Sequence, residues 1–188
     1  LGSGLEGKMR RRAYSSSIVS LDDDALPDLA VISDFAGLDV YRNTGMGLFR
    51  DVTAEWAPES RAFGMAHCFA DFNRDGIADL FVTGMTSPTV ERLNHLQLSR
   101  NESALDLRMR TDMTAGSRLF LGSNTGRFTQ TALGASAART GWAWGCAAPD
   151  VDNDGFADLF VVNGLESNAS VRDYEPEYWL HDRHAGNS

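Results

Sequence analysis

A nine-residue acidic segment occurs twice in this 188-residue chain and constrains its fold more than any other feature. Residues 71–79 read Asp-Phe-Asn-Arg-Asp-Gly-Ile-Ala-Asp, and residues 150–158 read Asp-Val-Asp-Asn-Asp-Gly-Phe-Ala-Asp. In both copies acidic or amide side chains occupy positions 1, 3, 5 and 9, and glycine occupies position 6. Oxygen ligands at alternate positions, with a glycine for the sharp bend, are what a hard cation such as Ca²⁺ requires. The two segments therefore predict two cation-binding loops.

A third segment fits the same frame less well. When it is aligned on its last aspartate, residues 20–28 place Ser20 at position 1 and Ala25 at position 6. A hydroxyl is a weaker first ligand than a carboxylate, and alanine adopts the bend less freely than glycine. We therefore expect a third calcium site of lower affinity here, or an empty loop. Its carboxylates at positions 3, 5 and 9 are Asp22, Asp24 and Asp28.

Two other interpretations of the acidic segments are open. An EF-hand has the same opening spacing, but it requires a glutamate at position 12 and flanking helices. Position 12 is Val82 in one copy and Val161 in the other, and the apolar residues around them favour strands. The segments could also be Asp-Gly turns that bind nothing, because Asp and Gly are common turn residues. In that case the carboxylates gathered on each loop would repel one another without a cation.

The repeat extends beyond the acidic loops. Residues 40–49 and 119–128 each read as a strand, a tight Asn/Gly turn and a second strand, which is a hairpin. Ahead of the second and third loops, residues 63–66 match residues 142–145. The unit is therefore strand, cation loop, strand and hairpin, which is the content of one propeller blade. The longer interval before the third loop indicates an insertion at about residues 86–116.

Together these motifs resemble FG-GAP/VCBS repeats, the calcium-binding blades of integrin-α-type β-propellers. The resemblance covers residues 18–182. Residues 42–53, read with residues 63–71, are most similar to cartilage-acidic-protein-like bacterial members. The resemblance implies an all-β chain, a partial β-propeller of about three FG-GAP-like blades with one helical insertion. The departures from the family pattern are Ser20, Ala25, Asn73 and Pro149.

We expect each of the last two blades to hold one structural Ca²⁺. The ion would tie together the loop between the first and second strands of its blade and neutralise the acids there. The expected ligands of the earlier loop are the side chains of Asp71, Asn73, Asp75 and Asp79 with the Ile77 carbonyl. Those of the later loop are the side chains of Asp150, Asp152, Asp154 and Asp158 with the Phe156 carbonyl.

The expected organisation has a short segment at each end and blades between. Closed propellers need about four to eight blades, so three units leave open edges that remaining propeller blades or a protein partner would cover. Ile18 and Val19 are the expected remnant of the first inner strand. The boundaries are 1–17 for the N-terminal segment, 18–62, 63–138 and 139–182 for the blades, and 183–188 for the tail.

The insertion contains the one helix that the sequence predicts. Ser87 can cap it, Pro88 suits its first position, and the apolar face would come from Val90, Leu93 and Leu96, up to about residue 100. Residues 101–116 are rich in Arg and Asp and are expected to be irregular. Near the end of the chain, Tyr178 and Trp179 are expected in a strand.

Composition and resemblance limit the class of partner. The net charge of −9 argues against nucleic acid, because phosphate binding needs a basic surface. No apolar run approaches the ~20 residues of a transmembrane segment, and no signal peptide is visible. Members of the resembled family serve in adhesion and recognition, which implies a protein or glycan partner. The implied location is extracellular or periplasmic, including association with a membrane complex.

Catalysis finds little support in the sequence. The four histidines are scattered, and no Gly-x-Ser-x-Gly, His-Glu-x-x-His or Cys-x-x-Cys motif occurs. We expect a non-enzymatic, calcium-binding module for protein or glycan recognition, or an accessory subunit of a larger extracytoplasmic assembly. The alternative is a non-catalytic propeller domain of an enzyme that acts on polysaccharide or small molecules, with its active site outside this segment.

The two cysteines are expected to remain free thiols. In the repeat alignment Cys146 falls opposite His67 and Cys68 falls opposite Ala147. Because side chains alternate between the faces of a strand, the thiols should point to opposite faces of adjacent blades. We therefore expect no disulfide between them.

Overall fold

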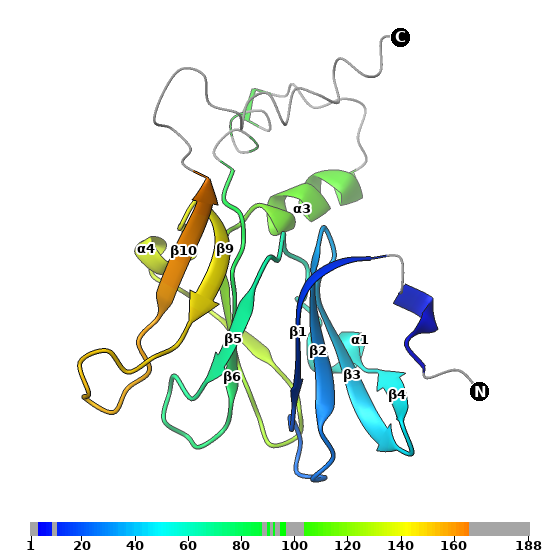
Figure 1. The fold of residues 1–188 in the computed structure, drawn as a ribbon. Helices are drawn as coiled ribbons and strands as arrows, with labels where there is room; N and C mark the ends of the chain where they lie inside the picture. The colour runs from blue at the N-terminus through cyan, green and yellow to red at the C-terminus, as the bar shows by residue number, and fades with distance from the viewer. Residues whose placement is uncertain are drawn as a thin grey trace.

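The fold consists mostly of antiparallel β-sheet. The computed structural model describes residues 4–8, 11–87, 90, 92, 95–96 and 104–165. Within these residues, two sheets have four strands each, in the orders β1-β2-β3-β4 and β5-β6-β7-β8, and a third pairs β10 with β9. Figure 1 shows the three sheets splayed side by side like part of a fan, with no closed barrel. The predicted all-β, partial-propeller fold is therefore confirmed.

The first blade is a complete four-stranded antiparallel sheet. Its inner strand is longer than the expected remnant at Ile18 and Val19, because β1 pairs with β2 over nearly its whole length. The turn between β3 and β4 is the predicted Asn/Gly turn, with Gly45, Met46 and Gly47 all at positive φ. Glycine tolerates this left-handed backbone without steric cost, which explains its two occurrences here. The strands are β1 (Arg12–Val19), β2 (Asp28–Asp34), β3 (Gly37–Gly45) and β4 (Leu48–Asp51).

The second and third blades follow the same order of strands. Every residue of β6 is buried, which accounts for its unbroken apolar run after Asp79. The hairpin predicted at residues 119–128 is the β7–β8 pair. The strands of the second blade are β5 (His67–Ala70), β6 (Asp79–Val82), β7 (Arg118–Leu121) and β8 (Thr129–Thr131). Those of the third are β9 (Trp142–Ala147) and β10 (Phe160–Leu165). The strand expected at Tyr178 and Trp179 lies outside the described residues.

The insertion between β6 and β7 contains a helix where the sequence analysis expected irregular chain. That expectation for residues 101–116 is wrong, because α3 spans Ala104–Met113. Alanine, leucine, arginine and methionine are strong helix formers, and their propensity outweighs the irregular charge pattern. The predicted cap at Ser87 is confirmed, since its Oγ accepts the Val90 N–H at 3.1 Å. The rest of the helix predicted up to residue 100 falls largely outside the described residues.

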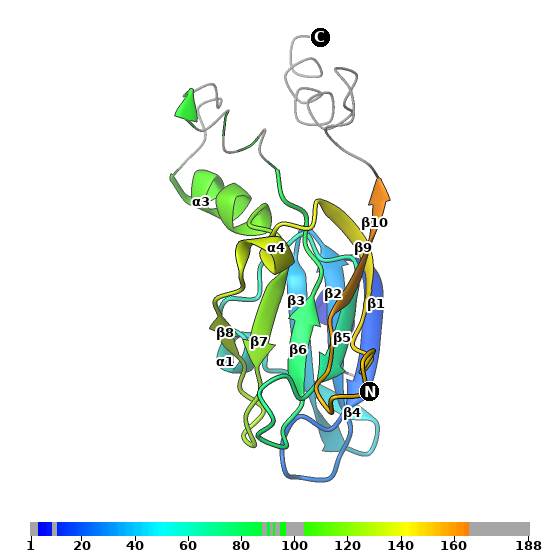
Figure 2. The same ribbon diagram turned by 90° about the vertical axis from the view of Figure 1, so that its left-hand side faces the viewer.

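Short helices complete the fold. They are η1 (Glu6–Lys8), α1 (Thr53–Trp56) and α4 (Ala135–Ala138). Figure 2 shows α3 and α4 beside one end of the second blade. None of the described helices is long and apolar enough to cross a membrane.

The main core lies between the first and second blades. Ile32 and Val40 of the first blade and Leu80 of the second are completely buried. The Trp56 ring covers Gly126, where an added Cβ would lie 2.5 Å from the ring, so only glycine fits this approach. A smaller cluster joins the second blade to α3 and the third blade: Phe63, Met85 and Met113, with Trp142 packed against it.

The inner strands β1, β5 and β9 lie next to one another, as Figure 1 shows. His67 of β5 bridges to β1, with its Nδ1 2.8 Å from Ser15 Oγ and its Nε2 2.8 Å from Ser17 Oγ. On the other side of β5, the Cys68 thiol lies close enough to the Cys146 thiol of β9 for each to shift the pKa of the other. The inner strands are therefore joined by polar side-chain contacts as well as by apolar packing.

Both cysteines are free, but the reason given for this in the sequence analysis is wrong. Cys68 and Cys146 do occupy opposite faces of adjacent blades. In a propeller, however, those are the two faces that pack against each other, so the thiols meet. Their proximity lowers the pKa of Cys68, and the same proximity together with burial raises the pKa of Cys146. The packing of the two blades therefore does not keep the two sulfur atoms apart, contrary to the expectation from the sequence.

His67 predicts a pH dependence of stability. Burial lowers the pKa of His67 below its ordinary value of 6.5. The unfolded chain therefore takes up this proton before the folded chain does, and stability present above pH 6.5 is lost as the pH falls from there to the folded pKa. We expect the melting temperature to fall in this window and the fall to be smaller in His67→Gln. Exposed His95, changed to Gln, is the matched control; an equal pH response in both variants would contradict the prediction.

Candidate metal centre

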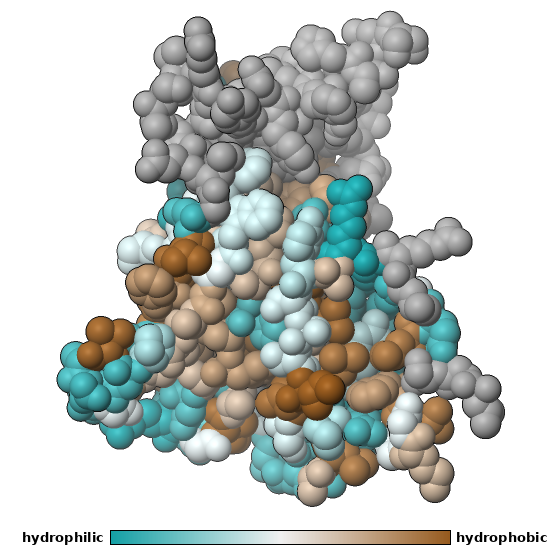
Figure 3. Space-filling model, viewed as in Figure 1, coloured by the Kyte–Doolittle hydropathy of each residue, from teal (hydrophilic) through white to brown (hydrophobic). Residues whose placement is uncertain are grey.

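All three acidic loops lie at the same end of the molecule. Each joins the first and second strands of its blade, after Val19, Ala70 and Ala147. Figure 1 places these loops along the lower rim, and the space-filling view shows hydrophilic residues gathered there (Figure 3). The repeat therefore brings its acidic side chains to one end of the partial propeller.

The carboxylate at position 1 organises the loop that follows it. In the third loop, Asp150 accepts the Asp154 N–H on Oδ1 at 3.1 Å and the Gly155 N–H on Oδ2 at 2.9 Å. For both N–H groups to point at one carboxylate, the backbone must be left-handed at position 4, where Asn153 has φ 60°, and at position 6, where Gly155 has φ 83°. Glycine at position 6 thus serves the bend that the sequence predicted.

The second loop has the same internal pattern. Asp71 accepts the Asp75 N–H at 3.0 Å and the Gly76 N–H at 2.8 Å. The left-handed residues are again those at positions 4 and 6, Arg74 with φ 62° and Gly76 with φ 85°. The two loops therefore share a backbone conformation as well as a sequence.

The third loop brings three carboxylates within reach of one ion. Oxygen atoms of Asp150, Asp152 and Asp158 all lie within 4.8 Å of one another. Carboxylates this close repel each other unless a cation or proton lies between them. Asp154, the fourth predicted side-chain ligand, is outside this cluster and accepts the Phe156 N–H on Oδ1 at 2.8 Å. The donor set is all oxygen, which suits a hard cation such as Ca²⁺.

The second loop is less open to a cation. The Asn73 side-chain amide donates to Asp75 Oδ2 at 2.9 Å, so the two predicted ligands bond to each other. The positions equivalent to the cluster of the third loop are Asp71, Asn73 and Asp79, so an amide stands where the third loop has its middle carboxylate. The asparagine at position 3 therefore distinguishes this loop from the third loop, where position 3 is Asp152.

The aspartate at position 9 fixes the loop to the rest of its blade. Asp79 is completely buried. Its Oδ2 accepts the Phe72 N–H of its own loop at 2.9 Å, and its Oδ1 accepts the Gly122 N–H of the β7–β8 turn at 2.8 Å. The sequence pattern indicated only a ligand role for Asp79 and carried no signal for this structural role.

The other two blades repeat this clamp in whole or in part. Asp28 accepts the Leu21 N–H at 3.1 Å and the Asn43 N–H at 2.8 Å. Burial raises the pKa of Asp28, although both hydrogen bonds oppose the shift. Asp158 accepts the Val151 N–H at 2.9 Å. Each acidic loop is therefore closed by its last aspartate.

An arginine lies against the acids of the first loop. Arg42 Nε is 2.8 Å from Asp22 Oδ2, and Arg42 Nη2 is 3.1 Å from Asp24 Oδ2. The pKa of Asp24 is lowered, mainly by the hydrogen bond that the Leu26 N–H donates, with the Arg42 charge adding to it. The guanidinium on β3 thus supplies positive charge to the first loop.

The sequence contains a signal for Arg42. Leu29 pairs with Tyr41 in the first blade as Leu80 pairs with Phe120 in the second, so Arg42 is equivalent to Leu121. Of these two blades, the one whose loop departs from the repeat pattern at Ser20 and Ala25 is therefore the one that carries the arginine.

Arg42→Leu should weaken the first blade in the absence of calcium. We expect a loss of about 1 kcal/mol, because Asp22 and Asp24 lose their counter-charge. Millimolar calcium should restore part of that loss by binding between the freed carboxylates. Urea denaturation with and without chelator measures both effects. Arg50→Leu removes an exposed arginine that pairs with Glu55 and serves as the control. Equal losses in the two variants would show that the first loop does not depend on Arg42.

The second and third loops contact each other. The Arg74 guanidinium carbon lies 4.2 Å from the centre of the Phe156 ring, a cation–π contact between neighbouring blades. Arg74 and Phe156 occupy positions 4 and 7 of their loops, and nothing in the sequence indicated that these side chains meet. A conformational change in one loop can therefore be transmitted to the other through this contact.

A comparison with protein families agrees with this geometry. The profile of the FG-GAP-like repeat matches residues 21–82 and 104–161, together more than half of the chain. Each matched segment ends in the strand that follows an acidic loop, at β6 and β10. The comparison with curated proteins gives no match. The repeated loops, the four-stranded blades and the family match lead to one conclusion: the chain belongs to the FG-GAP-like repeat family.

Proposed function

We propose that the chain is a calcium-stabilised recognition module. The observation that carries this proposal is the carboxylate cluster of Asp150, Asp152 and Asp158 in the third loop. FG-GAP-like repeats often bind calcium and form propeller-like recognition modules, and domains of this family are generally non-catalytic. This membership supports a role in binding rather than catalysis.

The residues of the third loop fit a calcium ion. Asp150, Asp152, Asp154 and Asp158 would supply side-chain oxygens, and Phe156 would supply its carbonyl. The second loop would supply Asp71, Asn73, Asp75 and Asp79 with the Ile77 carbonyl, at lower affinity because Asn73 is bonded to Asp75. In the first loop, Asp22, Asp24 and Asp28 would remain without calcium, since Arg42 pairs with two of them. The ion would provide positive charge that holds the loop between two strands.

The partner that we propose is an extracytoplasmic protein or glycan. The family is typically extracellular, and residues 42–53 and 63–71 support a place in its cartilage-acidic-protein-like bacterial branch. Phe160 and Val162 of β10 are 59% and 44% exposed, and they offer apolar surface for a partner protein or further blades. The module would then act as an accessory part of a larger assembly, including one at a membrane.

The proposal is tested by the calcium dependence of recognition. The full chain would be immobilised and probed with a glycan array and with a panel of extracytoplasmic proteins, in millimolar calcium and in chelator. We expect binding that is lost in chelator and reduced in Asp152→Asn. Asp23→Asn removes an exposed acid that is not a predicted ligand and is the matched control. Binding that is equally strong in calcium and in chelator, and that Asp152→Asn leaves unchanged, would contradict the proposal.

A further inference from the structure

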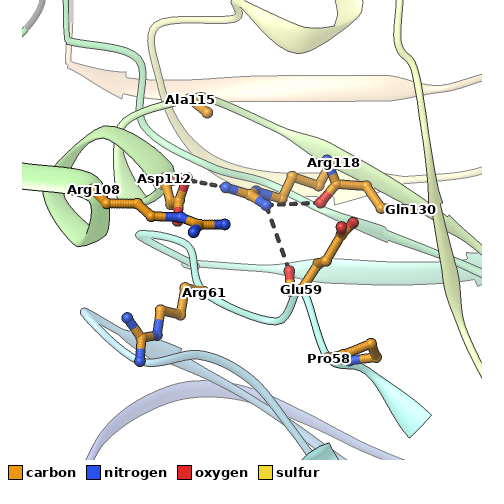
Figure 4. Close-up of a pocket in the computed structure, with 8 residues that line it drawn as sticks. All are labelled: Pro58, Glu59, Arg61, Arg108, Asp112, Ala115, Arg118 and Gln130. Carbon is orange, nitrogen blue, oxygen red and sulfur yellow. Dashed lines mark hydrogen bonds and ion pairs between the residues drawn. The ribbon is translucent and has the colours of Figure 1, made fainter. Parts of the chain in front are cut away.

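A second candidate site lies at the end of the second blade away from the acidic loops. It is a pocket of about 480 Å³, within the size range of small-molecule sites. Three distant segments form it: the chain after α1, the end of α3, and the strands β7 and β8. Figure 4 shows the side chains that line it, among them Glu59, Arg108, Asp112, Arg118 and Gln130.

Arg118 is the central feature of this pocket. It is the first residue of β7 and only 9% exposed. Its guanidinium donates to Gln130 Oε1 at 2.7 Å, to the Asp112 carbonyl, and more weakly to the Glu59 carbonyl at 3.5 Å (Figure 4). All three acceptors are neutral.

The charge of Arg118 is not compensated by direct contact. Within the part of the chain that the structure describes, no carboxylate forms an ion pair with Arg118, and its buried Nε has no hydrogen-bond partner. Burying a cation without a paired anion is costly. Burial accordingly lowers the pKa of Arg118, which the charges of Asp112 and Glu59 offset only in part. An anion in the pocket would relieve this cost.

The surroundings of Arg118 also favour an anion. The lining contains three arginines, Arg61, Arg108 and Arg118, against two carboxylates, Glu59 and Asp112, which leaves one net positive charge. Such a site is unusual on a chain whose net charge is −9. Arg108 Nε lies 3.9 Å from Asp112 Oδ2, and the Arg108 side chain is 82% exposed, so its guanidinium can turn toward a bound ligand.

We propose that this pocket binds a small carboxylate-bearing molecule of sugar size, such as a uronate, through Arg108 and Arg118. The exposed, planar guanidinium of Arg108 can donate two parallel hydrogen bonds to a carboxylate, Arg118 adds positive charge beside it, and Gln130 adds an amide for a neighbouring hydroxyl. The lining is mostly charged and polar, with only Pro58 and Ala115 apolar. It thus lacks the aromatic anchors of a protein interface. No lining residue belongs to an acidic loop, so this site is separate from the proposed calcium sites.

Titration with D-glucuronate tests the proposal, with D-glucose as the neutral control. Nuclear magnetic resonance would follow the arginine Nε–H and Gln130 amide signals of the full chain, in calcium and in chelator. We expect glucuronate alone to shift them, with binding that weakens as salt is added. Arg108→Gln should weaken binding about tenfold. Arg127→Gln, at an exposed arginine outside the pocket, should leave binding unchanged.

Arg118→Gln should abolish binding, and the exposed Arg108 provides the test if that buried variant does not fold. Equal shifts with glucose and glucuronate would overturn the proposal. So would the absence of any shift with glucuronate, or an equal loss of affinity in the Arg108 and Arg127 variants. Because the titration is run with and without calcium, failure of the calcium proposal would leave this result interpretable.

Discussion

Asp79→Ala is expected to destabilise the second blade by about 3 kcal/mol, even without calcium. The buried carboxylate accepts the N–H groups of Phe72 and Gly122, and alanine would leave both donors without an acceptor. Each unsatisfied buried group costs about 1–3 kcal/mol. Urea denaturation in chelator would show a lower midpoint with an unchanged slope.

Two further variants make this result specific to the clamp. Asp79→Asn keeps one oxygen acceptor and should lose less stability than Asp79→Ala. Asp75→Ala removes an exposed acid of the same loop and should cost less than about 1 kcal/mol. If Asp79→Ala cost no more than Asp75→Ala, the aspartate at position 9 would not be the structural clamp described here.

Millimolar calcium is expected to raise the melting temperature of the whole chain, and chelator to lower it. An ion that binds only the folded state stabilises it by about 2.7 kcal/mol at a hundredfold excess over its dissociation constant. We expect the affinity of extracellular modules, a dissociation constant on the order of 10⁻⁴ to 10⁻³ M. The carboxylate cluster of the third loop is the structural reason for this expectation.

Variants in two loops test where the calcium acts. Asp154→Ala should blunt the thermal response more than Asp22→Ala, because Asp22 is already paired with Arg42. Calorimetry across the millimolar range, with and without chelator, measures this difference. A melting curve that does not change with calcium would be incompatible with structural binding.

The repeated elements of the fold could be predicted from the sequence because each has a local cause. Gly76 and Gly155 marked the bends, and both have the positive φ that the loop frame needs. The apolar run from Leu80 to Val82 marked a buried strand, and its three residues are buried, whereas the matching run of β10 leaves Phe160 and Val162 exposed. The Asn/Gly turns marked the hairpins. Short-range patterns were therefore enough to derive the blades.

Contacts between blades could not be predicted in the same way, because they depend on how the units pack. The thiols of Cys68 and Cys146 were assigned to the correct faces, yet those faces meet. Arg42 reaches the first loop from β3, and Arg118 is buried against carbonyls of α3 and the chain after α1. Such contacts decide what each loop or pocket can bind. The pattern of residues within a single strand does not indicate them.

Calcium bound per chain, measured by isothermal titration calorimetry, tests the central claim most directly. We predict binding to the wild-type chain, with the third loop as the tighter site and the second loop as the weaker one. Asp152→Asn should remove the tighter site, Asn73→Asp should strengthen the weaker one, and Asp22→Asn should change neither. A wild-type chain that binds no calcium at millimolar concentration, or an Asp152→Asn variant that binds it as tightly as the wild type does, would contradict the account.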